Sequence, residues 1–332
     1  MVGAGAWGTT VASIVADRVP TRLWARESEV VEAVRRTGEN QPFLAGVRLP
    51  PALTVTDDIA VALDAADVVV VATPAQHVRT AMSAARSHVP GGAVILSVAK
   101  GIELGTGRRM TEVLHEVFAD RDPGSIGVLS GPNLAREIAT RQPAATCVAF
   151  TESAVAAAVQ RLFMSGALRV YTSDDVVGCE IGGAAKNVIA IAAGIAHGLG
   201  YGMNTMAALI TRGLAELTRL GVALGGHPLT FLGLAGNGDL IATCTSPQSR
   251  NRRVGEALAS GRPLADIIAG SPSVAEGVET APALLALAAS VDVEMPISAT
   301  VAALLRGELT QPEIVPLLMQ RSPKGELRGL GS

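Results

Sequence analysis

The chain has 332 residues, a formal net charge of −3 at pH 7, and a composition that is 48 % hydrophobic but only 3 % aromatic. This length predicts two domains, each large enough to enclose its own core. The near-neutral charge does not favour nucleic acid or an anionic membrane surface as a partner. A core of small aliphatic side chains suits parallel strands and closely packed helices better than an all-β sandwich.

The cysteines and histidines argue against a disulfide framework and against a metal site. The histidines show no ligand spacing, and the odd set of cysteines has no C-x-x-C pair, which indicates a reducing compartment. We expect no signal peptide, because no charged segment followed by an apolar one begins the sequence, and charged residues interrupt its longest apolar run. We therefore expect a soluble cytoplasmic protein without a resident metal. The cysteines are Cys147, Cys179 and Cys244.

The first residues match G-x-G-x-x-G, with Gly3, Gly5 and Gly8 at the glycine positions. In dinucleotide-binding turns these glycines permit the tight turn, the approach of the pyrophosphate and the packing of the next helix. Residues 9–16 predict that helix, whose N-terminus would face the phosphates. The preceding strand is reduced to Met1 and Val2, so we expect the central strand to be nearly missing, through a late start site or truncation.

Residues 21–26 predict the second strand, which ends at Arg26. An acid at this position usually binds the ribose 2′-hydroxyl of NAD, whereas arginine suits the 2′-phosphate of NADP. The alternative is an ordinary solvated loop arginine. We prefer NADP(H) as the cofactor, with NAD(H) as the second choice.

Strand and helix patterns alternate through the rest of the first half, which predicts a doubly wound, Rossmann-like α/β domain with a parallel sheet. Lys100 falls at the end of one strand, on the edge where such sheets bind ligands. A loop is expected at residues 40–51. Gly131 and Pro132 begin a helical stretch and would direct free backbone N–H groups toward a cleft. The expected strands are 67–74, 94–100, 126–130, 144–150 and 168–172, and the expected helices include 27–36 and 153–163.

After about residue 173 only helical patterns follow, which predicts an all-helical second domain. We place the domains at 1–173 and 174–332, with a ligand cleft between them. The expected helices are 176–198, 205–224, 253–260, 281–289 and 298–306.

Lys186 stands almost alone as a base in the apolar helix 176–198. Burial lowers a lysine pKa toward the range useful for proton transfer. Gly182 and Gly183 would lie beneath its stem and leave bare backbone for a small ligand. The alternative is a structural lysine paired with Glu180 or Asp239.

Two further stretches carry polar groups suited to a substrate. Asp239 follows a glycine-flanked loop, and a later helix is predicted with Ser246 as its N-cap. Ser249, Arg250 and Asn251 would then occupy the first turn, where free N–H groups can hold a phosphate. The alternative is a basic, solvated turn.

These motifs together resemble the bacterial type of NAD(P)-dependent glycerol-3-phosphate dehydrogenase. The resemblance runs in order across nearly the whole chain, and several of its motifs are specific in combination. The matching stretches are residues 3–9, 23–26, 100–103, 130–133, 183–190, 208–214, 236–240, 248–253 and 274–277.

The resemblance implies a role for individual residues. Lys186 would transfer the proton, with Asp239 orienting it or a substrate hydroxyl. Lys100 and Arg250 would contact both cofactor and substrate. Further cofactor contacts would come from Ala6, Trp7, Arg26, Ala135, Val274 and Glu276, and further substrate contacts from Gly131, Asn133, Asp239, Ser249 and Asn251.

The implied reaction interconverts dihydroxyacetone phosphate and sn-glycerol 3-phosphate and feeds glycerophospholipid synthesis. A related 3-hydroxy-acid dehydrogenase is the first alternative, because such enzymes also carry a Lys-Asn pair. A catalytically silent dinucleotide-binding paralogue is the second. Apolar helices in the second half make a homodimer plausible.

Overall fold

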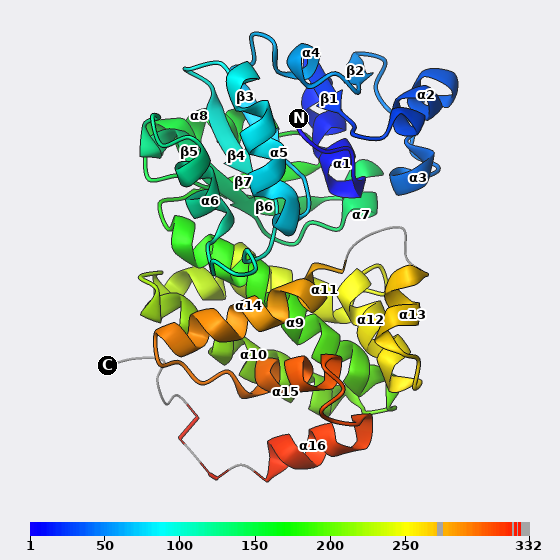
Figure 1. The fold of residues 1–332 in the computed structure, drawn as a ribbon, viewed down its shortest axis with the longest axis vertical. Coiled ribbons are helices and arrows are strands. Elements are labelled where there is room, and N and C mark those ends of the chain that lie inside the picture. The colour runs from blue at the N-terminus through cyan, green and yellow to red at the C-terminus, as the bar shows by residue number, and fades with distance from the viewer. Residues whose placement is uncertain (271–274, 321, 324, 327–332) are drawn as a thin grey trace. The chain divides into compact units, whose positions relative to one another are not determined.

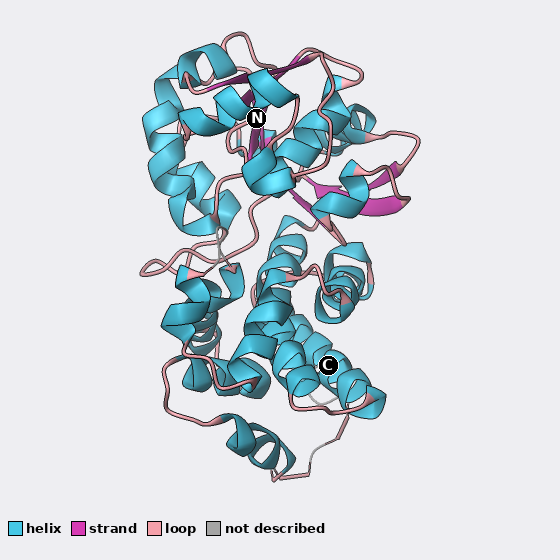
Figure 2. Ribbon diagram, turned by 90° about the vertical axis from the view of Figure 1, so that its right-hand side faces the viewer, coloured by secondary structure: helices cyan, strands magenta, loops and turns pink. Residues whose placement is uncertain are grey.

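The computed structural model describes residues 1–270, 275–320, 322–323 and 325–326 (Figure 1). The chain divides into two compact units. Unit 1 comprises residues 1–100 and 110–176, and unit 2 comprises residues 101–109 and 177–332. All named strands belong to unit 1, as the magenta arrows in Figure 2 show.

Unit 1 alternates strands with short helices. Its strands are β1 (Thr21–Trp24), β2 (Leu53–Thr56), β3 (Val68–Val71), β4 (Val94–Ser97), β5 (Ile126–Ser130), β6 (Ala144–Ala149) and β7 (Leu168–Ser173). Its helices are α1 (Ala6–Ala16), α2 (Ser28–Thr37), α3 (Gln41–Leu44), α4 (Ile59–Leu63), α5 (Val78–Ala85), α6 (Met110–Val117), α7 (Ala135–Ala139) and α8 (Ser153–Phe163).

The expectation of a nearly missing central strand is confirmed: the first residues take the central position of the sheet, but they form only isolated bridges and no named strand. Val2 forms parallel bridges to both Trp24 of β1 and Val71 of β3. The amide of Trp24 donates to the Met1 carbonyl at 2.9 Å, and the amide of Val2 donates to the Val70 carbonyl at 2.8 Å. Two residues suffice because the backbone groups of Met1 and Val2 bond to a strand on each side. They join the β1–β2 pair to the order β3-β4-β5-β6-β7.

The predicted doubly wound fold is confirmed, with one departure from an all-parallel sheet. β5 and β6 pair antiparallel, whereas β3, β4 and β5 are parallel and so are β6 and β7. Between β5 and β6 the chain forms only the five-residue α7, which packs against α1. A parallel connection needs a crossover of about a dozen residues or more, usually with a full helix.

Alternate residues of the central strands supply two hydrophobic cores, one on each face of the sheet. Val70 and Leu96 belong to the cluster that includes residues of α1 and α8. Val69 and Ile95 belong to the cluster that includes residues of α5 and α6. Burial on both faces explains why these strands read as unbroken apolar runs. Two local features differ from expectation: the loop at 40–51 contains α3, and β2 was not anticipated.

Unit 2 is built around α9 (Val176–Gly198), whose residues from Gly178 to Ala196 are buried. By length and composition alone α9 could cross a membrane, but 94 % of its most apolar window is buried inside the protein. It is therefore the core helix of this unit. The other helices are α10 (Met203–Ala223), α11 (Asp239–Thr245), α12 (Arg250–Ala259), α13 (Leu264–Ala269), α14 (Glu276–Ser290), α15 (Pro296–Leu305) and α16 (Gln311–Met319).

Glycines bring α9 and α12 into backbone contact. A Cβ on Gly194 would lie 2.0 Å from the Arg252 carbonyl oxygen, and a Cβ on Gly255 would lie 2.1 Å from the Ile191 carbonyl oxygen. Only glycine allows this approach, because any side chain would overlap the facing backbone. The close contact fixes the start of α12 beside the middle of α9, where Lys186 and Asn187 lie.

Candidate active site

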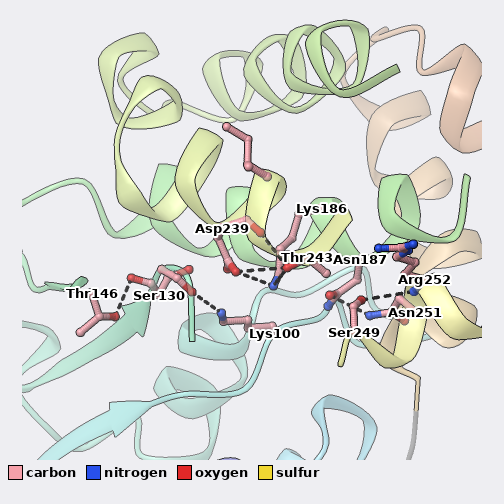
Figure 3. A network of polar contacts seen from close by, with 12 residues as sticks. Lys100, Ser130, Thr146, Lys186, Asn187, Asp239, Thr243, Ser249, Asn251 and Arg252 are labelled. Atoms are coloured by element: carbon pink, nitrogen blue, oxygen red, sulfur yellow. Dashed lines mark hydrogen bonds and ion pairs between the residues drawn. The ribbon is translucent and has the colours of Figure 1, made fainter. Parts of the chain in front are cut away.

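Lys186 is held in a buried polar cluster of unit 2 (Figure 3). Its side chain is 7 % exposed, and Nζ donates to Asp239 Oδ1 at 2.6 Å and to Thr243 Oγ1 at 2.6 Å. Asp239 and Thr243 are four residues apart on α11 and therefore share one face. Of the two partners weighed for Lys186, Asp239 is the one observed, while Glu180 pairs with Arg109 at 2.7 Å.

A tight turn before α11 places Asp239. Residues Leu234–Gly238 form a π-helical turn that runs directly into α11. A Cβ on Gly236 would lie 2.3 Å from the Phe231 carbonyl oxygen, and one on Gly182 would lie 2.5 Å from the Ala235 carbonyl oxygen. The expectation of bare backbone for a ligand at Gly182 is therefore wrong, because the turn itself fills that space.

A second buried cluster joins α9, α12 and α14. The Asn251 amide nitrogen donates to Asn187 Oδ1 at 2.9 Å, and the Gly277 backbone amide donates to Asn251 Oδ1 at 2.9 Å. A Cβ on Gly277 would lie 2.6 Å from the Asn187 carbonyl oxygen, so a side chain there would separate α14 from α9. Asn251 is thus occupied by protein groups on both sides of its amide.

The helix that carries the basic turn begins three residues later than the sequence suggested. Ser249 is the N-cap of α12, and its Oγ accepts from the Arg252 amide at 3.2 Å. Ser246 instead ends α11, where its Oγ accepts from the Gln248 amide at 3.1 Å. Pro247 and Gln248 form a turn between the two helices, so the helix begins only after Ser249, which supplies the cap bond. Arg250 is exposed and, within the described part of the chain, its guanidinium has no hydrogen-bond or ion-pair partner.

In unit 1 the glycine-rich turn has the shape that a dinucleotide requires. Gly3 has φ +114°, and a Cβ there would lie 2.8 Å from the Ala72 backbone. A Cβ on Gly8 would lie 2.1 Å from the Gly3 carbonyl oxygen, so the helix packs directly on the turn. Gly5 faces open space, and no side chain caps the first N–H groups of α1 at Ala6 and Trp7. These residues fit a pyrophosphate at the helix N-terminus.

Lys100, which Figure 3 labels, follows β4 in the chain, and Gly131 directly follows β5. Lys100 Nζ donates to the Gly131 carbonyl oxygen at 2.9 Å. Gly131 has φ +148°, and a Cβ there would lie only 3.0 Å from Thr146 Oγ1. Nearby along the chain, neither polar atom of the buried Asn133 amide has a hydrogen-bond partner in the part of the chain that the structure describes. A bound substrate or cofactor would provide such partners.

The remaining predicted cofactor residues differ in their surroundings. Arg26 follows β1 and is 74 % exposed, with its guanidinium bonded to Glu27 Oε1 at 2.6 and 2.9 Å. Ala135 begins α7, and its carbonyl accepts from Thr10 Oγ1 at 3.1 Å. Glu276 is the first residue of α14. Val274 lies outside the described residues.

Comparison with known proteins shows the family. The family model described as the N-terminus of NAD-dependent glycerol-3-phosphate dehydrogenase matches residues 1–156, and the one described as its C-terminus matches residues 175–316. The chain belongs to this family. The recognition made from the sequence motifs is therefore confirmed.

Two curated relatives are named glycerol-3-phosphate dehydrogenase [NAD(P)+]. The one numbered 2 from Sphingopyxis alaskensis is 50 % identical over 323 residues, which covers 97 % of this chain and 96 % of that protein. The one from Thermobifida fusca is 49 % identical over 332 residues, with 99 % and 98 % covered. Both names agree with an NAD(P)-dependent enzyme and not with the 3-hydroxy-acid alternative.

Solved structures agree with this assignment. A glycerol-3-phosphate dehydrogenase from Coxiella burnetii has a TM-score of 0.92 at 34 % identity, covering 96 % of this chain and 98 % of that one. A ketopantoate reductase from Ralstonia eutropha has a TM-score of 0.57 at 15 % identity, covering 95 % of this chain and all of that one. The second likeness shows a shared fold alone.

Sequence reasoning missed two polar residues of the clusters. Thr243 bonds to Lys186, and Asn187 bonds to Asn251. The four-residue spacing from Asp239 could have indicated Thr243, since both side chains then project from one helical face. Cys244, the next residue, offers no nucleophile, because burial raises the pKa of its thiol to about 12.

Proposed function

We propose that the chain interconverts dihydroxyacetone phosphate and sn-glycerol 3-phosphate with NAD(P)H, and that Lys186 is its proton-transfer residue. The observation that carries the proposal is the buried set of Lys186, Asp239 and Thr243 in a chain of this family. A buried lysine bonded to a carboxylate and a hydroxyl is a positioned proton donor.

In the direction of reduction, Lys186 acts on the substrate carbonyl oxygen. The reduced nicotinamide supplies a hydride to the carbonyl carbon when it is bound. Negative charge then grows on the oxygen, and the Lys186 ammonium stabilises that charge and donates a proton. In the reverse direction the neutral amine accepts the proton from the substrate hydroxyl. Asp239 and Thr243 hold Nζ in one place, so little reorganisation is needed during the reaction.

The phosphate of the substrate fits the start of α12. Arg250 is exposed and unpaired within the described chain, and it lies in the first turn of a helix whose N–H groups favour an anion. Ser249, which is the N-cap, and Asn251, which lies in the first turn, flank Arg250, and their side chains are bonded within the protein. We propose that Arg250 makes the main phosphate contact, with Lys100, Gly131 and Asn133 as further substrate residues.

For the cofactor, we propose that the Gly3, Gly5 and Gly8 turn holds the pyrophosphate with Ala6 and Trp7. Arg26 would bind the 2′-phosphate of NADPH, which is the preferred form. Roles for Ala135, Val274 and Glu276 follow from the family resemblance.

The assay that tests the function follows the absorbance of reduced nicotinamide with dihydroxyacetone phosphate as substrate. The wild type should oxidise NADPH, and Lys186→Ala should lower turnover on the order of a thousandfold or more. Binding of NADPH, measured by fluorescence titration, should stay near normal in the variant. Turnover by Lys186→Ala close to that of the wild type would remove Lys186 from the mechanism. Cofactor binding by the wild type without turnover would favour a catalytically silent paralogue.

Three wider expectations belong to the same proposal. The product would feed glycerophospholipid synthesis, and the protein would work in the cytoplasm. A homodimer is a further prediction, in keeping with Leu229 and Leu232 of unit 2, which are 64 % and 65 % exposed. Light scattering of the purified protein tests the dimer directly.

A further inference from the structure

Arg252, in the first turn of α12, bonds through its side chain to groups before and after it in the chain. Its guanidinium donates through Nη1 to the Thr245 carbonyl and through Nε to Glu256 Oε1 at 2.9 Å. Its backbone amide donates to Ser249 Oγ at 3.2 Å. The side chain is only 11 % exposed, so these bonds are largely shielded from water.

These bonds lie at the connection between α11 and α12, which carry different groups of the proposed site. Thr245 is the last residue of α11, the helix that carries Asp239 and Thr243. Ser249 is the N-cap of α12, which carries Arg250. Arg252 therefore connects the end of α11, whose Asp239 and Thr243 bond to Lys186, to the turn that would bind the phosphate. A guanidinium at the carboxyl end of α11 also satisfies a terminal carbonyl and suits the negative end of the helix dipole.

Arg252 is poorly suited to bind the phosphate itself. Its guanidinium already contacts a carbonyl and the Glu256 carboxylate, and that carboxylate would repel an anion beside it. Glu256 Oε1 also lies 3.6 Å from His197 Nε2. Arg250, in contrast, is exposed, and its guanidinium has no partner within the described residues.

We propose that Arg252 is a positioning residue that fixes the distance between the phosphate-binding turn and the proton-transfer group. This inference rests on the proposed function, because it assigns the phosphate to the α12 turn and the proton to Lys186. Phosphate binding then orients the reacting carbon only if the turn and α11 keep a fixed spacing. Without the Arg252 bonds the phosphate would still bind locally, but the carbonyl would be misplaced relative to Nζ.

The test compares Arg252→Gln with Arg253→Gln, which removes the same charge from the next, exposed position. Misplacement by about 1 Å can cost on the order of a hundredfold, so we expect kcat on dihydroxyacetone phosphate to fall at least about tenfold in Arg252→Gln. KM should change less than kcat. Arg253→Gln should behave as wild type, and Arg252→Lys should recover part of kcat because it keeps a cationic donor.

Dihydroxyacetone, which has no phosphate, separates positioning from general damage. A residue that transmits the position of the phosphate should leave the slow reduction of dihydroxyacetone unchanged. An equal fall for both substrates, or a rise in KM with kcat unchanged, overturns the proposal. Melting temperature and NADPH binding of each variant show whether it is folded.

The outcomes also separate this inference from the proposed function. If the wild type does not reduce dihydroxyacetone phosphate, the proposed function fails and the role of Arg252 fails with it. If the wild type is active and Arg252→Gln keeps its kcat, only the role of Arg252 fails.

Discussion

Buried polar atoms without a hydrogen-bond partner are concentrated in unit 1, whereas unit 2 shows one such atom among the described residues, Thr280 Oγ1. In unit 1 several buried polar atoms near the carboxyl ends of the strands lack hydrogen-bond partners among the described residues, including the Asn133 amide and the hydroxyls of Ser97 and Ser130. In unit 2 the buried Lys186, Asp239 and Asn251 are bonded to one another or to neighbouring groups. An unpaired buried polar group is costly, so it needs a physical reason.

The difference matches two kinds of work. In the proposed function, unit 1 recognises a ligand, and recognition leaves groups free for that ligand to bond. Unit 2 would carry the proton transfer, and a proton donor works best when its position is fixed before the substrate arrives. Variants that disturb the bonded set in unit 2, or that fill an unpaired position in unit 1, test this contrast.

The largest effect is expected when the bonded set of unit 2 loses its charge partner. Asp239→Asn removes the carboxylate from Lys186 Nζ and leaves a buried ammonium with an amide and a hydroxyl. We expect kcat to fall on the order of 10²–10³-fold, as for the loss of other positioned polar groups. Breaking a buried ion pair also costs about 3–5 kcal/mol of stability. Steady-state kinetics and urea unfolding measure the two effects, and Thr243→Ser, which keeps its hydroxyl, is the mild control.

Glu216 tests whether hydrogen bonds fully offset the burial of a charged group in unit 2. It caps α15 by accepting from the amides of Ile297 at 2.6 Å and Ser298 at 3.2 Å. Burial nevertheless raises the pKa of its carboxyl to about 7, against the lowering effect of these bonds. A raised folded pKa contributes stability that is full below the unfolded value of 4.5 and is lost as pH rises through 7.

Glu216→Gln removes this titration. The stability of the wild type relative to the variant should therefore fall between pH 4.5 and 7, by on the order of 3 kcal/mol. Burial also lowers the pKa of the Met1 amino group to about 5, but this group titrates equally in both proteins and cancels in the difference. Urea unfolding of both proteins at several pH values measures the difference in their stability. Parallel stability curves for the two proteins would show that Glu216 does not titrate in this range.

In unit 1 the matching experiment fills an unpaired position. Asn133→Leu replaces an amide that has no partner with an apolar group of similar size. Removing an unsatisfied buried polar group should stabilise the free protein by about 1 kcal/mol. The same change should raise KM for dihydroxyacetone phosphate about tenfold, because the substrate loses hydrogen bonds. A loss of stability together with an unchanged KM would mean that Asn133 is a structural residue.

The features predicted best from the sequence are those at positions where only one type of residue fits. The Gly3 and Gly8 positions admit no side chain, so glycine marks them, and the isolation of Lys186 in an apolar helix indicated a buried base. The sequence predicted poorly what depends on contacts between distant segments. Nothing local distinguishes Ser246 from Ser249 as a cap, and the space above Gly182 is filled by a turn more than fifty residues away.

The smallest expected effect concerns the choice of cofactor in unit 1. Arg26 is exposed and bonded to Glu27. The 2′-phosphate of NADPH would replace the Glu27 carboxylate as the partner of Arg26, whereas the 2′-hydroxyl of NADH could donate a hydrogen bond to that carboxylate. Arg26→Ala should therefore lower the ratio of kcat/KM for NADPH to that for NADH by about fivefold to tenfold, since an exposed charge contact contributes little. Glu27→Gln should shift the ratio the other way, because it removes the charge that repels the phosphate. Changes of the ratio in opposite directions in the two variants would show that Arg26 and Glu27 together determine the choice between NADPH and NADH. An unchanged ratio in both would leave Arg26 as a solvated surface residue.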